Sequence, residues 1–200
     1  MFINPKKIPN PRATFKGFTL VELLVVLAII ASLAAIAFPV TKSMLNKGKI
    51  TETKMRMQEI EAAIDNYNSD NGHLPHAGGS YPSSETVSNT DFNDLVAILL
   101  NKETNSGEAN VTGKKYLLMP DAKSKKNGIV YSNNDKSEVQ YVVDAWGEEF
   151  EVLIDYDLDG EILKTIPGET NNSVKNKSVI IISKGTDGDT GNDDDIYSWK

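Results

Sequence analysis

The chain has 200 residues, no cysteine and a formal net charge of −7. This acidic balance is the wrong sign for a surface that binds nucleic-acid phosphates, so we expect no nucleic-acid partner. Because no disulfide can form, an exported domain of this size needs either a sufficient apolar core or another staple, such as a metal ion.

The first 17 residues form a leader that contains no acidic side chain. Its prolines oppose helix formation, and its basic residues all precede a long apolar run: Lys6, Lys7, Arg12 and Lys16. By the positive-inside bias, the leader stays in the cytoplasm and the chain after residue 40 crosses the membrane.

The apolar run extends from Phe18 to Val40 and is interrupted by only four residues, Thr19, Glu22, Ser32 and Pro39. As an α-helix it would be roughly 35 Å long, which is enough to cross a hydrocarbon core. A buried helix of a soluble domain would show one polar stripe, and this run shows none. The sequence therefore predicts a transmembrane helix over residues 18–40.

Glu22 is a carboxylate inside that apolar run. At bilayer depth such a charge costs about 3 kcal/mol even on a lenient scale, so we expect it to have a partner. No Lys, Arg or His occurs between Phe18 and Thr41. The partner is therefore expected from outside the body of this helix.

The stretch from Lys16 to Leu24, KGFTLVELL, resembles the type III signal of type IV pilins and type II secretion pseudopilins. The resemblance implies that a prepilin peptidase cuts between Gly17 and Phe18 and that Phe18 is N-methylated. It also implies that Glu22 pairs with the new amino group of a neighbouring subunit and that Pro39 stands at a proline position of the family. An ordinary signal anchor, the alternative, does not account for Glu22.

Beyond the membrane segment the helical pattern continues to about residue 70. Pro39 removes a backbone donor, so a bend or a locally melted joint is expected around it. A stripe at three- and four-residue spacing predicts the face on which a sheet packs, and it comprises Met57, Ile60, Ile64 and Tyr67. Asn71-Gly72 is a helix stop.

The next segment reads as loop followed by a short helix. His73 and His76 are the only histidines, and a surface loop is favoured over a metal pair because no third ligand is near. Residues 77–90 are rich in turn formers and predict a loop. An acidic start and an apolar face predict a helix over residues 91–100, with Asp91 as its N-cap.

Strands are predicted over residues 139–143, 150–154, 162–166 and 178–183. Between the first two, Asp144-Ala145-Trp146-Gly147 resembles the Asp-Pro-Trp-Gly turn of the same family, with alanine in place of proline. Residues 155–160, DYDLDG, imitate the first half of an EF-hand loop, but the twelfth position is Ile166. A hairpin turn is favoured there, and a weak calcium site involving Asp155, Asp157 and Asp159 is the alternative.

The C-terminal stretch carries five aspartates between positions 187 and 195. Hard cations such as Ca²⁺ take six to eight oxygen ligands, and carboxylates crowded on one turn repel each other without a cation. The apolar residues Ile196, Tyr197 and Trp199 follow the loop. They give it an anchor that a frayed tail would not need.

This loop resembles the C-terminal calcium site of the major pseudopilins of type II secretion. The resemblance implies that Ca²⁺ is bound by the side chains of Asp187 and Asp194, with backbone carbonyls from Lys184, Asp189 and Asn192. Three consecutive aspartates leave the register open by one, so Asp193 or Asp195 is an alternative ligand. Calcium is then expected to fold the loop and to stand in for disulfides.

The expected fold is α+β and type IV pilin-like, with a long N-terminal helix, transmembrane in its first half, packed on a small antiparallel sheet. Its expected parts are a cleaved leader (1–17), a transmembrane and filament-core helix (18–40), the periplasmic half of the helix (41–72) and a globular domain with the calcium loop (73–200). Segments 77–138 and 155–177 are longer than in a typical member of the family.

The resemblance implies a structural subunit of the type II secretion pseudopilus, a homopolymer in the inner membrane with a cytoplasmic N-terminus and a periplasmic domain. It also implies minor pseudopilins, an inner-membrane assembly platform and the prepilin peptidase as partners. The alternative is a type IV pilin, or a minor or DNA-uptake pseudopilin. No catalytic Ser/His/Asp or Cys/His set and no phosphate-binding glycine loop occurs, so no enzyme is expected.

Overall fold

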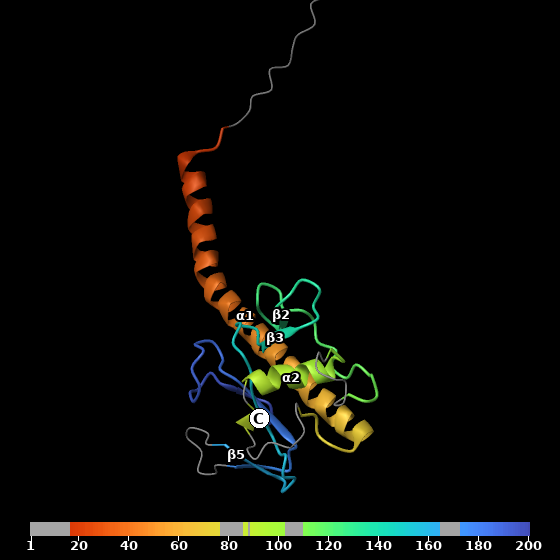
Figure 1. The fold of residues 1–200 in the computed structure, drawn as a ribbon. Helices are drawn as coiled ribbons and strands as arrows, with labels where there is room; N and C mark the ends of the chain where they lie inside the picture. The colour runs from red at the N-terminus through yellow and green to blue at the C-terminus, as the bar shows by residue number, and fades with distance from the viewer. Residues whose placement is uncertain (1–16, 77–85, 88, 103–109, 165–172) are drawn as a thin grey trace, which may run out of the picture. The chain divides into compact units, whose positions relative to one another are not determined.

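The computed structural model describes residues 17–76, 86–87, 89–102, 110–164 and 173–200. Expectations for the leader before Gly17, for most of the loop at 77–90 and for Ile166 lie outside these residues. Within them the chain forms, in order, α1 (Leu20–Asn71), β1 (Thr86–Val87), α2 (Asn89–Leu99), β2 (Gly128–Tyr131), β3 (Val139–Val143), β4 (Glu151–Ile154), β5 (Glu161–Leu163), β6 (Ser173–Lys175), β7 (Val179–Ser183) and β8 (Ile196–Tyr197) (Figure 1).

The chain divides into two compact units, Met1–Met44 and Leu45–Lys200, and α1 contributes to both. In the first unit the helical backbone is continuous through position 39. Beyond it, the hydroxyl of Thr41 donates to the carbonyl of Ala37 at 2.9 Å. This continuity argues against local melting in the single chain, and the behaviour of the joint in a filament stays a prediction.

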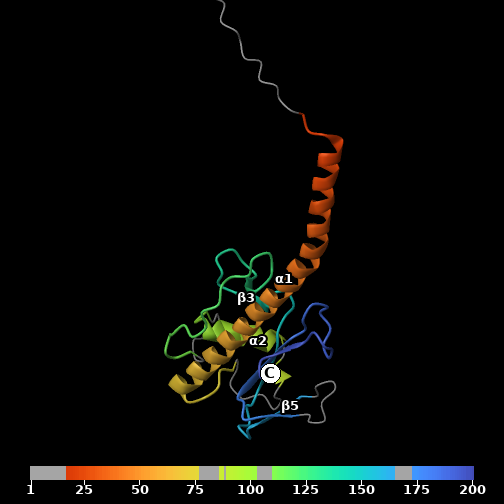
Figure 2. The same ribbon diagram turned by 180° about the vertical axis from the view of Figure 1, so that it is seen from behind.

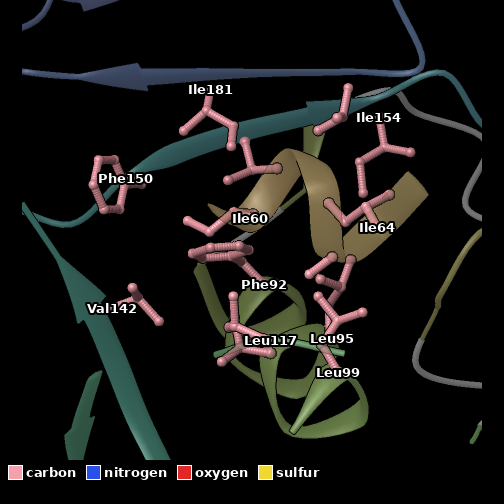
Figure 3. Packing of buried hydrophobic residues seen from close by; sticks show 14 of the residues in the cluster. Ile60, Ile64, Phe92, Leu95, Leu99, Leu117, Val142, Phe150, Ile154 and Ile181 are labelled. Carbon is pink, nitrogen blue, oxygen red and sulfur yellow. The ribbon is translucent and has the colours of Figure 1, made fainter. Parts of the chain in front are cut away.

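In the second unit α1 supplies the centre of the main core. The predicted stripe is confirmed, because its members are all fully buried: Met57, Ile60, Ile64 and Tyr67. Figure 3 shows Ile60 and Ile64 between the sheet strands that carry Ile154 and Ile181 and the helix that carries Leu95 and Leu99. Both Figure 1 and Figure 2 show α2 crossing this half of α1. The predicted α+β fold, a long helix packed on small antiparallel sheets, is confirmed.

The main sheet has the antiparallel order β1-β4-β7-β8, with Glu151 opposite Ile182 and Ile154 opposite Val179 in the central pair. In the strand predicted at residues 150–154, the last three residues, Val152, Leu153 and Ile154, are all buried. Both faces of β4 are covered. One meets the main core, and the other meets a second cluster made of Leu153, Ile162, Val174, Ile180 and Ile182, with Tyr197 and Trp199 packed against it.

The hairpin predicted at residues 155–160 is wrong. β4 pairs with β1 and β7, whereas β5 pairs with β6, so this turn connects two different sheets. The physical reason is that β4 gains more by pairing with the fully buried strand β7 than with its three-residue neighbour in sequence, β5. The turn residues at 155–160 do not indicate which distant strand β4 pairs with.

Smaller boundary errors occur around the second helix. α2 begins at Asn89, so Asp91 lies in the first turn rather than at the N-cap. Strand β1 lies within the segment predicted as loop. The structure adds a strand, β2, that begins at Gly128. The predicted helix stop is confirmed, since α1 ends at Asn71 and the φ of Gly72 is +74°.

Candidate functional site

The peptide bond between Gly17 and Phe18 lies outside the helix. Residues 17–19 have no regular secondary structure, and α1 begins at Leu20. Phe18 is 82% exposed, and a Cβ added at Gly17 would meet no atom within 4 Å. The bond is therefore accessible to a protease without any unfolding of α1.

Glu22 closes the N-terminus of α1 in a capping box with Thr19. One carboxylate oxygen of Glu22 accepts from the backbone N–H of Thr19 at 2.8 Å and from its hydroxyl at 2.9 Å. In return, the N–H of Glu22 donates to the Thr19 hydroxyl at 3.2 Å. The sequence T-x-x-E is the known signature of this motif, and our sequence interpretation missed it.

The expected charged partner of Glu22 stays a prediction, because Thr19 itself precedes α1. Thr19 supplies local hydrogen bonds, but it carries no charge. None of the ion pairs in the described part of the chain involves Glu22. A cation for this carboxylate is still expected from elsewhere.

The first half of α1 exposes its apolar side chains all round. From Gly17 to Met44 no described side chain is buried, and Leu20, Ile36 and Phe38 are 78%, 69% and 76% exposed. This is the candidate membrane-spanning helix among the described residues, by its length and composition. Such a surface is stable only in lipid or against other apolar helices.

The acidic C-terminal loop is held closed by its own hydrogen bonds. One oxygen of Asp194 accepts from the backbone N–H and the hydroxyl of Thr186 and from the N–H of Asp187, and these bonds hold the pKa of Asp194 below its usual value. The other predicted side-chain ligand, Asp187, accepts from the N–H of Asp189 at 2.9 Å and from the Asn192 amide at 2.9 Å. Among the predicted carbonyl ligands, those of Asp189 and Asn192 already accept one hydrogen bond each within the loop.

The neck of this loop requires glycine. Gly185 has a φ of +66°, and a Cβ placed there would lie 2.3 Å from the backbone carbonyl of Asp194. The other end is fixed by β8, where Ile196 is buried in the main core opposite Ser183. The apolar anchor predicted for the loop is therefore confirmed.

The fit of the loop to a cation can be tested on its unsatisfied atoms. Oδ2 of Asp195 accepts from Gly191 N–H at 2.7 Å and from the Tyr197 hydroxyl at 3.0 Å, whereas its Oδ1 is buried with no hydrogen-bond partner. Asp193 is exposed. The donor set fits a hard cation, although the described acids of this loop do not form a three-carboxylate cluster.

The two histidines pack as part of a loop. The ring of His73 stacks edge-on against Tyr67, with centroids 5.6 Å apart, and its Nδ1 lies 3.1 Å from the carbonyl of Leu74. Among the described residues, no third His, Asp or Glu joins His73 and His76 in a metal-ligating group.

Asp144 organises the turn that precedes β4. It is fully buried, and its Oδ1 accepts from the N–H groups of Trp146, Gly147 and Glu148 at 2.8, 2.9 and 3.0 Å. Its Oδ2 accepts from the Ser183 hydroxyl at 2.5 Å, and Ser183 in turn accepts from Gly185 N–H at 3.3 Å. Asp144 thus links this turn to the neck of the C-terminal loop.

Comparison with known proteins identifies a motif in the N-terminal part of the chain. Residues 12–38 match the prokaryotic N-terminal methylation motif. The chain is 41% identical over 59 residues to the type II secretion system core protein G of Pseudomonas aeruginosa, covering 30% of this chain and 42% of that protein. It is also 35% identical over 81 residues to the fimbrial protein EcpC of Eikenella corrodens, covering 40% of this chain and 53% of that protein.

The chain is type IV pilin-like.

A third relative covers more of the type IV pilin-like chain at lower identity. This is the prepilin peptidase-dependent protein D of Escherichia coli, 25% identical over 105 residues, which are 52% of this chain and 72% of that protein. The chain spans only about half the length of the first two relatives. No solved structure matches.

The matched motif contains the predicted processing and assembly residues Gly17, Phe18 and Glu22, whereas Pro39 lies one residue beyond it. The hydrogen bond between Asp144 and Ser183 supports the type IV pilin-like fold, and the sequence did not predict it. They are 39 residues apart, and only the pairing of β7 beside the Asp144 turn brings them together.

Replacing Asp144, which is fully buried, with alanine is expected to destabilise the type IV pilin-like domain by about 3–5 kcal/mol, because three partly buried N–H groups lose their acceptor. Urea unfolding of the detergent-solubilised full chain measures the change. The Asp144→Asn control keeps one acceptor oxygen and is expected to lose less than half as much. Stability of Asp144→Ala within about 1 kcal/mol of wild type would contradict this role.

Proposed function

We propose that this chain is a structural subunit of a type II secretion pseudopilus, which polymerises into a periplasmic fibre that supports protein export. One observation carries the proposal. The methylation motif at residues 12–38 coincides with a half-helix of which no described side chain is buried within the chain. Its work is polymerisation rather than bond making, because that apolar surface needs other helices around it once it leaves lipid.

In the fibre, the apolar halves of α1 pack together and Glu22 sets their stagger. Cleavage after Gly17 creates an ammonium at Phe18, and the ammonium of a neighbouring subunit supplies the cation that Glu22 lacks. The capping box with Thr19 holds one oxygen of the carboxylate at the helix N-terminus. The other oxygen is left for the neighbour.

The same proposal places the leader in the cytoplasm and the domain after Met44 in the periplasm. The support is the basic leader, with Lys6, Lys7, Arg12 and Lys16 before the apolar run. The prepilin peptidase, minor pseudopilins and an inner-membrane assembly platform are the partners that such a subunit requires.

Calcium in the C-terminal loop is part of the proposal. Asp187 and Asp194 contribute carboxylate oxygens, and Lys184, Asp189 and Asn192 contribute carbonyl oxygens. The buried, unpartnered Oδ1 of Asp195 favours Asp195 over the exposed Asp193 as the additional ligand. A bound cation would remove the repulsion among these acids and rigidify the loop that β8 closes.

A type IV pilin is the second candidate, and the similarity to the fimbrial protein EcpC favours it. Deletion of the gene separates the two. Loss of protein export with surface fibres intact supports the pseudopilin, and loss of surface fibres with export intact supports the pilin.

Mass spectrometry of the membrane-extracted protein tests the proposed processing. We expect the loss of residues 1–17 and the gain of one methyl group at Phe18. A functional protein that retains its first 17 residues would refute the proposal.

Gly17→Ala is expected to leave the leader attached. A Cβ at Gly17 meets no atom within 4 Å, so this change has no folding cost in the chain and reports recognition by the peptidase. Gly48→Ala is the matched control, because Gly48 is also open and lies within α1. Immunoblotting should show the longer precursor for Gly17→Ala alone, and normal cleavage of this variant would be contrary to expectation.

A further inference from the structure

A second acidic cluster lies in the turn between β4 and β5, remote in sequence from the C-terminal loop. Asp155, Asp157 and Asp159 each bring a carboxylate oxygen within 4.8 Å of the others. The backbone holds both ends of the turn. Asp155 N–H donates to the carbonyl of Ser178 at 3.0 Å, and the carbonyl of Gly160 accepts from Asn176 N–H at 2.9 Å. The three carboxylates therefore converge on a turn that is tied to the β6–β7 connection.

Asp155 is the unusual member of the cluster, because it is only 4% exposed. Its Oδ2 accepts from Gly160 N–H at 3.0 Å, while its Oδ1 is buried without a hydrogen-bond partner. None of the ion pairs in the described ranges includes it. Burial of an ionised carboxylate with an empty oxygen is costly unless a cation or a proton compensates it.

The neighbouring acids make that cost larger. Asp157 and Asp159 are exposed. The Asp157 carboxylate accepts from Asp159 N–H at 3.5 Å, and the Asp159 carboxylate accepts from Glu161 N–H at 2.8 Å. Burial, together with the Asp157 carboxylate beside it, raises the pKa of Asp155. The site thus concentrates negative charge around one buried, unsatisfied oxygen.

We propose that the turn from Asp155 to Gly160 binds a calcium ion through the carboxylates of Asp155, Asp157 and Asp159. Oxygen ligands at alternate positions followed by glycine suit a hard cation, and water can complete the shell. The twelfth position is Ile166, so no bidentate acid follows. The affinity expected for such a half-loop is weak, with a Kd of about 10⁻⁴–10⁻³ M, as in extracellular calcium modules.

The bound ion would join the two sheets. The turn follows β4 of the main sheet, leads into β5 of the small sheet and is bonded to the segment that leads into β7. Calcium would therefore stabilise the cover that β5 and β6 place over Leu153, Ile180 and Ile182.

The alternative state of the turn is a protonated Asp155 with no ion, and Asp155→Asn separates the two because asparagine imitates the neutral acid. In calcium-free buffer we expect this variant to melt at or above the temperature of its parent, since the buried charge is gone. Added calcium is expected to raise the Tm of the parent but not that of the variant.

The experiment uses the detergent-solubilised full chain carrying Asp187→Asn and Asp194→Asn, so that the C-terminal loop does not contribute. CaCl₂ is titrated to about 10 mM, above the expected Kd range, while Tm and binding heat are followed. We expect half-saturation between about 0.1 and 1 mM, and a weaker response to MgCl₂ because Mg²⁺ demands stricter octahedral geometry.

Two variant sets make the test decisive. The Asp157→Asn, Asp159→Asn pair alters exposed side chains only, so it serves even if Asp155→Asn fails to fold, and it should weaken binding at least about tenfold. Asp135→Asn, an exposed acid bonded to Ser137 after β2, is the matched control and should leave binding unchanged. No calcium-dependent shift in the parent, or the same shift in the Asp157/Asp159 pair, would overturn the site. Neither result would bear on the C-terminal loop.

Discussion

Glu22→Gln is expected to be cleaved and inserted normally but to lower the yield of fibres about tenfold or more, because loss of one partner from a desolvated charge pair costs several kcal/mol. Glutamine at this position still accepts the Thr19 hydrogen bonds of the capping box. The variant therefore removes only the negative charge. Quantitative immunoblotting of sheared or purified fibres, normalised to processed subunit, measures the effect.

Thr19→Val is the matched control for this prediction. It removes the hydroxyl that bonds Glu22 but retains the Thr19 backbone N–H and the charge. We expect fibres close to wild-type yield, since the remaining backbone bond still orients the carboxylate. The reverse pattern, normal fibres from Glu22→Gln and few from Thr19→Val, would show that Glu22 acts as a helix cap and not as a charge partner.

Chelation of calcium is expected to lower the Tm of the detergent-solubilised chain by about 5–10 °C, compared with buffer that contains about 0.1 mM free Ca²⁺. A shift of this size corresponds to an ion present at about 100 times the Kd of its site. The proposed source is the C-terminal loop, where Asp187 and Asp194 lie among carbonyl donors and Asp195 has a buried, unpartnered oxygen. At this concentration the turn at Asp155, with an expected Kd of about 10⁻⁴–10⁻³ M, would be at most about half occupied and would contribute little to the shift. Differential scanning fluorimetry with and without a chelator gives the shift.

The Asp187→Asn, Asp194→Asn double variant should lose this chelator response. Asparagine keeps acceptor oxygens for the bonds from Thr186 and Asp189 N–H, so the loop can close while its charge is lost. Asp135→Asn changes the net charge in the same direction, by one unit instead of two, and it should respond to the chelator as wild type does. A wild-type Tm indifferent to the chelator would remove calcium from the proposed function.

Several features of this protein followed from the sequence because their causes are local. The length of the apolar helix follows from its number of residues and the helical rise of about 1.5 Å per residue. The buried stripe of Met57, Ile60 and Ile64 follows from helical periodicity. The capping box between Thr19 and Glu22 belongs with them, since its T-x-x-E spacing was readable.

The tertiary structure alone decided the pairings between distant segments. β4 pairs with β7 and not with β5, so the predicted hairpin is instead a connection between two sheets. Asp155, at the start of this connection, is buried. The hydrogen bond between Ser183 and Asp144, 39 residues apart, likewise depends on the position of β7. Strand partnership depends on which surfaces bury the most apolar area across the whole domain, and that sum is not contained in any single stretch of sequence.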